Sequence, residues 1–255
     1  MPMVSLAVAG GTGVVGRLVV DAARRRGHEV TVLARSTGVD LTSGAGVDEA
    51  MAGVERVVDV TNLTTLRARR AVAFFDGVTQ RLLGAAERAG VEHVVALSVV
   101  GCDRVDLGYY LGKRAQESAL AAGPVPWTLL RATQFYEFAN LAIDHGPPGL
   151  VVAQRMRCQP IAAAEVAEAL VDAVEGPPAG RLPDLAGPRE HQLDQLVRQI
   201  VVARGLRRAV VSMPLPGSLG RQVREGGLLP TADAGDPVLG TEPFEDWLAR
   251  VYPQT

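Results

Sequence analysis

A strand-length apolar run that leads directly into closely spaced glycines is the feature that most constrains the fold. The run covers Val4–Ala9, and glycines follow at positions 10, 13 and 16. Apolar residues at helical spacing begin at once after the turn, from Val14 onward. This order predicts a strand, a tight turn and a helix, because glycine permits the sharp turn that joins them.

The same turn has the properties of a dinucleotide cradle. Glycines let a pyrophosphate approach the main chain, and the helix N-terminus stabilises its charge. A second predicted strand, Glu29–Ala34, completes a β-α-β unit. The spacing Gly-x-x-Gly-x-x-Gly resembles that of extended and atypical short-chain dehydrogenases/reductases. The predicted cofactor contacts in this turn are Gly10, Gly11, Thr12, Gly13, Val14, Val15 and Gly16.

Length and composition limit the class of protein. A chain of 255 residues fits a single domain, 1–255, with a small appended lobe formed mainly by about 182–255. The two cysteines and four histidines have no metal-ligand spacing, so we expect no metal site. A net charge of −2 gives no electrostatic case for a nucleic-acid partner. Without an apparent membrane span or basic leader, a cytoplasmic location is the expectation.

The residue after the second strand predicts which cofactor is preferred. An acidic residue there binds the ribose 2′-hydroxyl of NAD, whereas an arginine accommodates the 2′-phosphate of NADP. Arg35 occupies the position, and a guanidinium can hold a phosphate with two hydrogen bonds. The pattern therefore favours NADP (NADPH) over NAD. The alternative is an ordinary solvated arginine in an arginine-rich chain.

The next segment is expected to supply further cofactor contacts. We expect a short third strand at Val39–Leu41 and a buried strand at Arg56–Val60. Thr61 and Asn62 follow the second of these, where parallel sheets bind ligands, although each could equally be a turn residue or helix cap. In the resembling family, an aspartate placed like Asp40 lies against the adenine.

Candidate catalytic residues follow a predicted helix at Ala73–Ala89. Ser98 ends the strand that begins at His93, and Tyr109 and Lys113 are four residues apart, so they share one face of a helix. A tyrosine with a lysine four residues later and an upstream serine is the arrangement of short-chain reductases.

The chemistry explains the choice of residue types. A phenol with a pKa of about 10 needs a nearby positive charge to exchange protons at neutral pH. Serine would hold the substrate carbonyl oxygen, and lysine would also bind the nicotinamide ribose. Lys113 is the only lysine of the chain. Two alternatives remain: Tyr110 is the acid, or both tyrosines are buried aromatics beside an exposed Lys113.

A later motif makes the resemblance more specific. The strand ending Arg-Ala-Thr-Gln-Phe at 131–135 is similar to that of NmrA-like, atypical short-chain dehydrogenases/reductases that bind NAD(P)H, and the likeness covers most of residues 3–190. It implies an α/β fold, a Rossmann-type doubly wound parallel sheet with a small C-terminal α+β substrate lobe. Periodicity in that lobe predicts strands at Leu182–Ala186 and Ala209–Met213 and helices at Leu193–Ala203 and Phe244–Val251.

We therefore expect an NADP-dependent oxidoreductase that passes hydride between NADPH and a carbonyl or enone of a small, mostly apolar substrate. The resemblance also leaves open a non-catalytic NADP-bound redox sensor that acts through a protein partner, because the family contains both kinds. A pure sensor has no chemical need for Ser98, Tyr109 and Lys113 together.

Overall fold

The computed structural model describes residues 3–144, 147 and 149–253. The chain divides into two compact units. The first unit comprises Met1–Arg131 and Ala164–Leu182, and the second comprises Ala132–Ala163 and Pro183–Thr255.

The first unit is built on a sheet whose strands are ordered β2-β1-β3-β4-β5, with β8 also paired to β5. The β1–β2, β1–β3, β3–β4 and β5–β8 pairs are all parallel. The strands are β1 (Ser5–Ala9), β2 (Glu29–Leu33), β3 (Arg56–Asp59), β4 (His93–Val99), β5 (Trp127–Ala132) and β8 (Gly180–Arg181). Valine, leucine and alanine fill β1, β3 and β4, as expected for parallel strands that helices cover on both faces.

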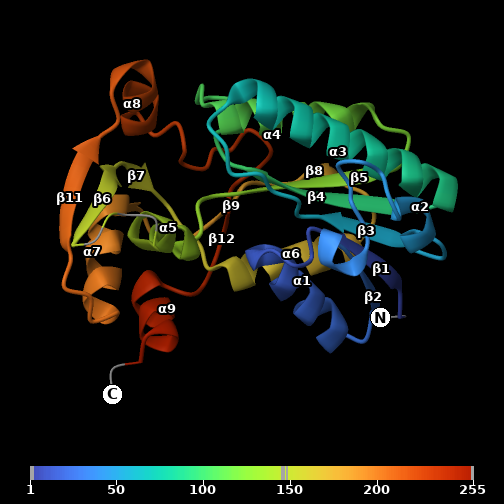
Figure 1. The fold of residues 1–255 in the computed structure, drawn as a ribbon, viewed down its shortest axis with the longest axis horizontal. Coiled ribbons are helices and arrows are strands. Elements are labelled where there is room, and N and C mark those ends of the chain that lie inside the picture. The colour runs from blue at the N-terminus through green and yellow to red at the C-terminus, as the bar shows by residue number, and fades with distance from the viewer. Residues whose placement is uncertain (1–2, 145–146, 148, 254–255) are drawn as a thin grey trace. The chain divides into compact units, whose positions relative to one another are not determined.

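Helices cover both faces of this sheet (Figure 1), with α3 and α4 on one face and α1 and α6 on the other. They are α1 (Val14–Arg25), α2 (Val47–Ala50), α3 (Ala68–Ala89), α4 (Gly108–Ala122) and α6 (Ala163–Glu175), with a short 3-10 helix, η1 (Arg35–Thr37), after β2. In α1 the buried side chains include Val15, Val19 and Ala23, four residues apart, so one face of the helix packs on the sheet.

A glycine sets how closely α3 and α4 pack. A Cβ on Gly112 would lie 2.6 Å from the ring of Phe75 and 2.8 Å from the methyl of Ala71. Glycine at this position therefore lets α4 press against α3. The next residue, Lys113, is brought over the Phe75 ring by this contact.

The predicted strand at Val39–Leu41 is wrong. Asp40 forms only an isolated bridge with Ala45, and the third strand of the chain is Arg56–Asp59. The carboxylate of Asp40 accepts hydrogen bonds from the Thr42 N–H (2.8 Å) and the Ser43 hydroxyl (3.1 Å). These local bonds compete with strand pairing and turn the chain instead.

The second unit contains short strand pairs and helices. Its strands are β6 (Leu150–Arg155), β7 (Arg157–Cys158), β9 (Leu185–Ala186), β10 (His191–Gln192), β11 (Ala209–Pro214) and β12 (Val238–Leu239). Its helices are η2 (Tyr136–Phe138), α5 (Ala139–Asp144), α7 (Leu193–Ala203), α8 (Gly217–Arg224) and α9 (Phe244–Val251). β6 pairs parallel with β11, β7 antiparallel with β10, and β9 parallel with β12. Tyr136, Phe244 and Trp247 pack ring against ring in the core of this unit.

The predicted fold class, α/β with a Rossmann-type doubly wound sheet, is confirmed. The helices Leu193–Ala203 and Phe244–Val251 have the predicted bounds. The helix predicted from Ala73 begins five residues earlier at Ala68. Residues 132–163, which precede the predicted C-terminal lobe, belong to the same compact unit as 183–255.

Candidate functional site

The strand order of the first unit locates its ligand-binding edge. β1 lies between β2 and β3, and the helices that follow β1 and β3, α1 and α3, lie on opposite faces of the sheet (Figure 1). Such a reversal opens a crevice at the carboxyl ends of the two strands. The glycine turn follows β1, and Thr61 and Asn62 come just after β3, so both predicted segments meet at this edge.

The glycines of the turn have different structural reasons. Gly10 has a φ of +78°, and a Cβ there would lie 3.0 Å from backbone atoms of Thr61. A Cβ on Gly16 would lie 2.1 Å from the carbonyl oxygen of Gly10, so Gly16 is required by the chain itself. Gly13 is the N-cap of α1 in an extended conformation, and its Cβ would meet only the Gly10 oxygen, at 3.3 Å. The protein's own packing therefore excludes a side chain at Gly13 much less strongly than at Gly16.

The N-terminus of α1 is available for an anion. No acidic residue occupies its first turn, so no carboxylate competes for the helix dipole there. Arg17, whose guanidinium donates to the Thr12 carbonyl (2.7 Å), adds a positive charge to the turn. Gly11, Thr12, Val14 and Val15 complete the turn and the start of the helix, and Val14 is 53% exposed.

Two predicted residues lie beyond the end of β2. Arg35 begins η1 and is exposed, with no ion pair among the described residues. Asp40 anchors the following loop through its bonds to Thr42 and Ser43, and these hydrogen bonds lower the pKa of its carboxyl. Arg35 is therefore accessible to a ligand, while Asp40 has a structural task as well.

The residues after β3 connect the glycine turn to α4. Thr61 is 7% exposed, and its hydroxyl oxygen is buried with no hydrogen-bond partner among the described residues. Asn62 accepts a hydrogen bond from the hydroxyl of Tyr109 (3.0 Å). The structure therefore links the glycine turn to α4: Gly10 lies against Thr61, and the next residue, Asn62, is hydrogen-bonded to Tyr109.

The two tyrosines at the start of α4 differ in exposure. Tyr110 is 9% exposed, whereas Tyr109 is partly exposed and packs edge-on against Phe75 and Tyr110. Burial raises the pKa of both phenols above the ordinary tyrosine value. Both are therefore neutral at physiological pH, and Tyr109 is the one that reaches Asn62.

Lys113 is buried rather than exposed, at 3%. Its ammonium donates to the Leu97 carbonyl (3.1 Å) and to Oε1 of Gln116 (2.8 Å), and it lies 4.5 Å from the centre of the Phe75 ring. Burial lowers the pKa of this amine to about 8. Lys113 and Tyr109 both contact Phe75, but no hydrogen bond between the two is present in the described part of the chain.

Ser98 belongs to a second polar cluster. Its hydroxyl donates to Oε1 of Glu117 (2.5 Å), and Glu117 forms a two-pronged ion pair with Arg131. Arg131 also binds Asp103 at 2.7 Å. Cys102 donates to the same Glu117 oxygen, and burial raises the pKa of this thiol to about 12. The Ser98 hydroxyl thus donates its hydrogen bond to Glu117 rather than to Tyr109.

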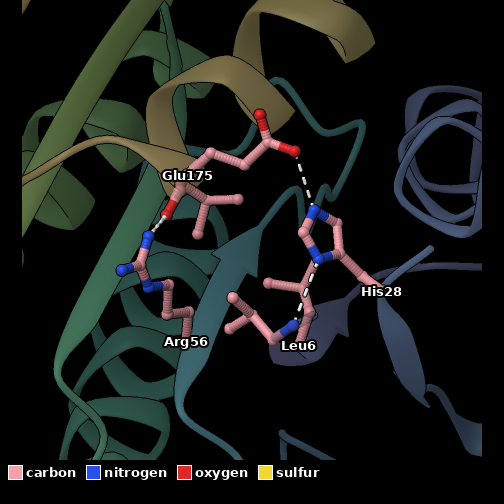
Figure 2. Close-up of a pocket in the computed structure, with 6 residues that line it drawn as sticks. Leu6, His28, Arg56 and Glu175 are labelled. Atoms are coloured by element: carbon pink, nitrogen blue, oxygen red, sulfur yellow. Dashed lines mark hydrogen bonds and ion pairs between the residues drawn. The ribbon is translucent and has the colours of Figure 1, made fainter. Parts of the chain in front are cut away.

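A small pocket lies at the other edge of the sheet (Figure 2). It is lined by residues at the amino ends of β1 and β3, including Leu6 and Arg56, together with His28 and Glu175. The His28 ring contacts the Glu175 carboxylate at 2.7 Å, and Arg56 donates to the Val174 carbonyl. These contacts tie the end of α6 to the sheet, and the predicted cofactor residues lie at the carboxyl ends of the strands instead.

Three residues of this region were not predicted from the sequence. Asp59 accepts hydrogen bonds from Gln116 (2.9 Å) and from the Thr61 N–H (2.9 Å), and Glu117 holds Ser98. A carboxylate that ends a buried strand, as Asp59 does, was the available signal. Gln116 and Glu117 lie in the turn of helix after Lys113, and only the fold shows what they face.

Comparison with known proteins gives a family. Residues 10–177, more than half of the chain, match the model of a family described as NAD(P)H-binding. The chain is 33% identical over 144 residues to the (4-alkanoyl-5-oxo-2,5-dihydrofuran-3-yl)methyl phosphate reductase of Streptomyces griseus subsp. griseus. That match covers 50% of this chain and 47% of the relative, so it spans about half the length of the curated protein.

Solved structures share the fold at low identity. A short-chain dehydrogenase/reductase superfamily protein from Agrobacterium tumefaciens with bound NAD has a TM-score of 0.68 at 20% identity, over 97% of this chain and 95% of that one. An NADPH-dependent quinone oxidoreductase from Escherichia coli has a TM-score of 0.65 at 18% identity, over 97% and 99%. These likenesses extend over both units, and they do not distinguish NAD from NADP. Among the described residues, no helix combines the length and apolar character that a membrane crossing requires.

Proposed function

This chain is a member of the NAD(P)H-binding family, and on that basis we propose that it is an NADPH-dependent oxidoreductase acting on a carbonyl or conjugated alkene of a small, mostly apolar substrate. The observation that carries the proposal is the hydroxyl of Thr61, which is buried without a partner in the described chain, in a residue whose backbone lies against Gly10 of the glycine turn. An unsatisfied buried hydroxyl costs about 1–3 kcal/mol, so a ligand that bonds to it is favoured.

The residues present fit a dinucleotide. The glycine turn, with a single close backbone neighbour at the Gly13 Cβ position, and the N-terminus of α1 without an acidic residue suit a pyrophosphate, and Arg17 adds a positive charge. Arg35 would bind the 2′-phosphate, since it is exposed and has no ion pair among the described residues. Asp40 keeps acceptor capacity beyond its two local bonds and is proposed to face the adenine.

A nicotinamide supplies or accepts the hydride when it is bound, and the protein has to handle the proton. Tyr109 is a neutral phenol at physiological pH and carries a proton to give, while burial raises its pKa and makes it a weaker acid than an ordinary tyrosine. It is therefore proposed to donate this proton to the substrate oxygen. Its bond to Asn62 holds the hydroxyl at the carboxyl edge of β3, and Lys113 contributes a buried positive charge to the same helix.

The role proposed for Ser98 requires a rotation. Its hydroxyl points to Glu117, and it would bind a substrate oxygen only after turning about χ1. The substitution Ser98→Ala separates the two roles. A loss of turnover with unchanged stability favours substrate binding, and a loss of stability with normal turnover per folded molecule favours the structural bond.

The conjugated substrate is supported by the curated relative. Its name describes a reductase of an unsaturated 5-oxo-2,5-dihydrofuran that carries an alkanoyl group and a methyl phosphate, so the ring of that substrate is conjugated while the molecule also bears a charged group.

The test is turnover with NADPH across carbonyl and enone substrates, using Tyr109→Phe and Tyr110→Phe as a matched pair. The proposal expects loss of turnover only in the first variant. The sensor role has one observation in its favour, since the Ser98 and Lys113 polar atoms are both engaged in the interior. No turnover in the wild type, combined with partner binding that differs between NADPH and NADP⁺, would establish that role instead.

A further inference from the structure

A buried chain of hydrogen bonds connects the lysine of α4 to the end of β3. Lys113 donates to Oε1 of Gln116 (2.8 Å), and Nε2 of Gln116 donates to Oδ2 of Asp59 (2.9 Å). The other Asp59 oxygen accepts the N–H of Thr61 (2.9 Å). The exposed fractions of Lys113, Gln116 and Asp59 are 3%, 0% and 1%, so water does not compete for these bonds.

The carboxylate of Asp59 sets the direction of these hydrogen bonds. Asp59 can only accept, so the amide nitrogen of Gln116 must face it, and the amide oxygen must then face Lys113. An oxygen in that place favours the charged ammonium. Hydrogen bonds in a low-dielectric interior also polarise one another, so the negative charge of Asp59 acts on Lys113 through the amide.

The other groups around Lys113 contribute less negative charge. Cys102 is a neutral thiol, because burial raises its pKa to about 12, and the charge of Glu117 is matched by Arg131. From α3, the Phe75 ring adds a cation-π contact, and from β4 comes the Leu97 carbonyl. Glu117 is paired with Arg131, whereas the carboxylate of Asp59 bonds only to the Thr61 N–H and the Gln116 amide in the described part of the chain. The charge of Asp59 is therefore the one that remains to act on Lys113.

We propose that Asp59 is a positioning residue of the reductase, which acts through Gln116 to keep Lys113 charged and oriented while fixing the Thr61 backbone beside the glycine turn. This inference rests on the proposed function. Two of the three ammonium donors serve Leu97 and Gln116, so the amine keeps one donor for the cofactor or for Tyr109.

The consequence is a defined pH behaviour. Burial opposes the charge and lowers the pKa of Lys113 to about 8, with Asp59 raising it against that effect. The amine is therefore mostly charged at neutral pH and loses its proton as the pH rises through this value. Without the carboxylate, the proton should be lost at a lower pH, and the basic limb of the turnover profile should move with it.

A single lysine makes the test direct. In protein labelled with isotopic lysine, the side chain of Lys113 gives one NMR resonance that needs no assignment, because the chain has no other lysine. Titration of the cofactor-free protein should give a midpoint near pH 8 for the wild type. Asp59→Asn and Gln116→Met should each weaken proton binding roughly tenfold or more. Gln116→Met leaves the bond between Asp59 and Thr61 in place, so it decides the question should Asp59→Asn fail to fold.

The matched control is Asp184→Asn. Asp184 is also a buried carboxylate, 2% exposed, but it accepts a hydrogen bond from the N–H of Thr231 instead of from Gln116. Its removal should leave the Lys113 midpoint unchanged. The inference is overturned when a folded Asp59→Asn or Gln116→Met protein keeps the wild-type midpoint.

The titration needs no NADPH, so it is independent of the proposed function. A wild type without turnover that still shows the displaced midpoints would refute the reductase and leave the Asp59–Gln116–Lys113 coupling intact. With turnover present, the basic limb of kcat/KM, which reports the free enzyme, should shift in Asp59→Asn and Gln116→Met by the same factor as the NMR midpoint.

Discussion

Alanine at Gly16 should lower the stability of the protein, whereas alanine at Gly13 should lower its affinity for NADPH. At Gly16 the new Cβ would lie 2.1 Å from the Gly10 oxygen and 2.7 Å from the Gly11 Cα, both backbone atoms that cannot rotate away. Overpacking of this kind costs about 1–3 kcal/mol, and we expect the upper end. At Gly13 the nearest atom is 3.3 Å away, and the backbone angles, φ −73° and ψ 178°, suit alanine. The stability change at Gly13 should therefore stay below about 1 kcal/mol.

Cofactor affinity should separate the two variants in the other direction. A methyl on Gly13 occupies the space in which we place the pyrophosphate, and losing a charge-assisted contact costs roughly 1.5–3 kcal/mol, or ten- to a hundredfold in Kd. Thermal unfolding and calorimetric titration with NADPH measure both quantities. Gly16→Ala should lower Tm by roughly 6–12 °C, at about 2–4 °C per kcal/mol. A Gly13→Ala protein of wild-type stability that binds NADPH normally would refute the placement of the phosphates.

Four further predictions follow from the site. Arg35→Ala should reduce the preference for NADPH over NADH roughly ten- to a hundredfold, measured by titration with both cofactors; unchanged discrimination would move the 2′-phosphate elsewhere. Tyr109→Phe should lower turnover by roughly 10² to 10⁴ with NADPH affinity nearly constant, whereas Tyr110→Phe should retain turnover; the reverse outcome would make Tyr110 the acid. Glu117→Gln leaves a buried guanidinium without its main partner and should cost about 3 kcal/mol in denaturant unfolding, so an unchanged midpoint would contradict the importance of this pair. The pKa of Lys113 is lowered to about 8 from 10.5, so between these values the unfolded chain binds more protons at this residue than the folded one, and the free energy of unfolding should rise with pH. Lys113→Met should lose that rise, and a variant with the same slope as the wild type would contradict the lowered pKa of Lys113.

The parts of the fold that sequence analysis predicted are those set by local patterns. The apolar run, the glycines and the periodic residues after them determine β1, the turn and α1 within a short stretch. The helices at Leu193–Ala203 and Phe244–Val251 have strong amphipathic patterns and the predicted bounds. By contrast, α8 was missed because Gly217 and Gly220 lower its intrinsic helix propensity, which tertiary packing overrides.

The failures come from interactions that are not visible in a local pattern. Val39–Leu41 has strand-like composition, but the Asp40 side chain bonds to Thr42 and Ser43, and those bonds win over pairing with the sheet. The contact between Gln116 and Asp59 joins residues 57 positions apart, so no spacing rule indicates it. The predicted catalytic positions Ser98, Tyr109 and Lys113 lie on the expected elements, while their hydrogen-bond partners depend on how α4 packs on α3 and the sheet.

A crystal structure of the protein with NADPH tests the central claim most directly. The account predicts the pyrophosphate over Gly10–Gly16 at the N-terminus of α1, the 2′-phosphate beside Arg35, and the Thr61 hydroxyl hydrogen-bonded to the cofactor. Density for NADPH at another place, or none at saturating concentration while the Thr61 hydroxyl stays unpaired, would contradict it.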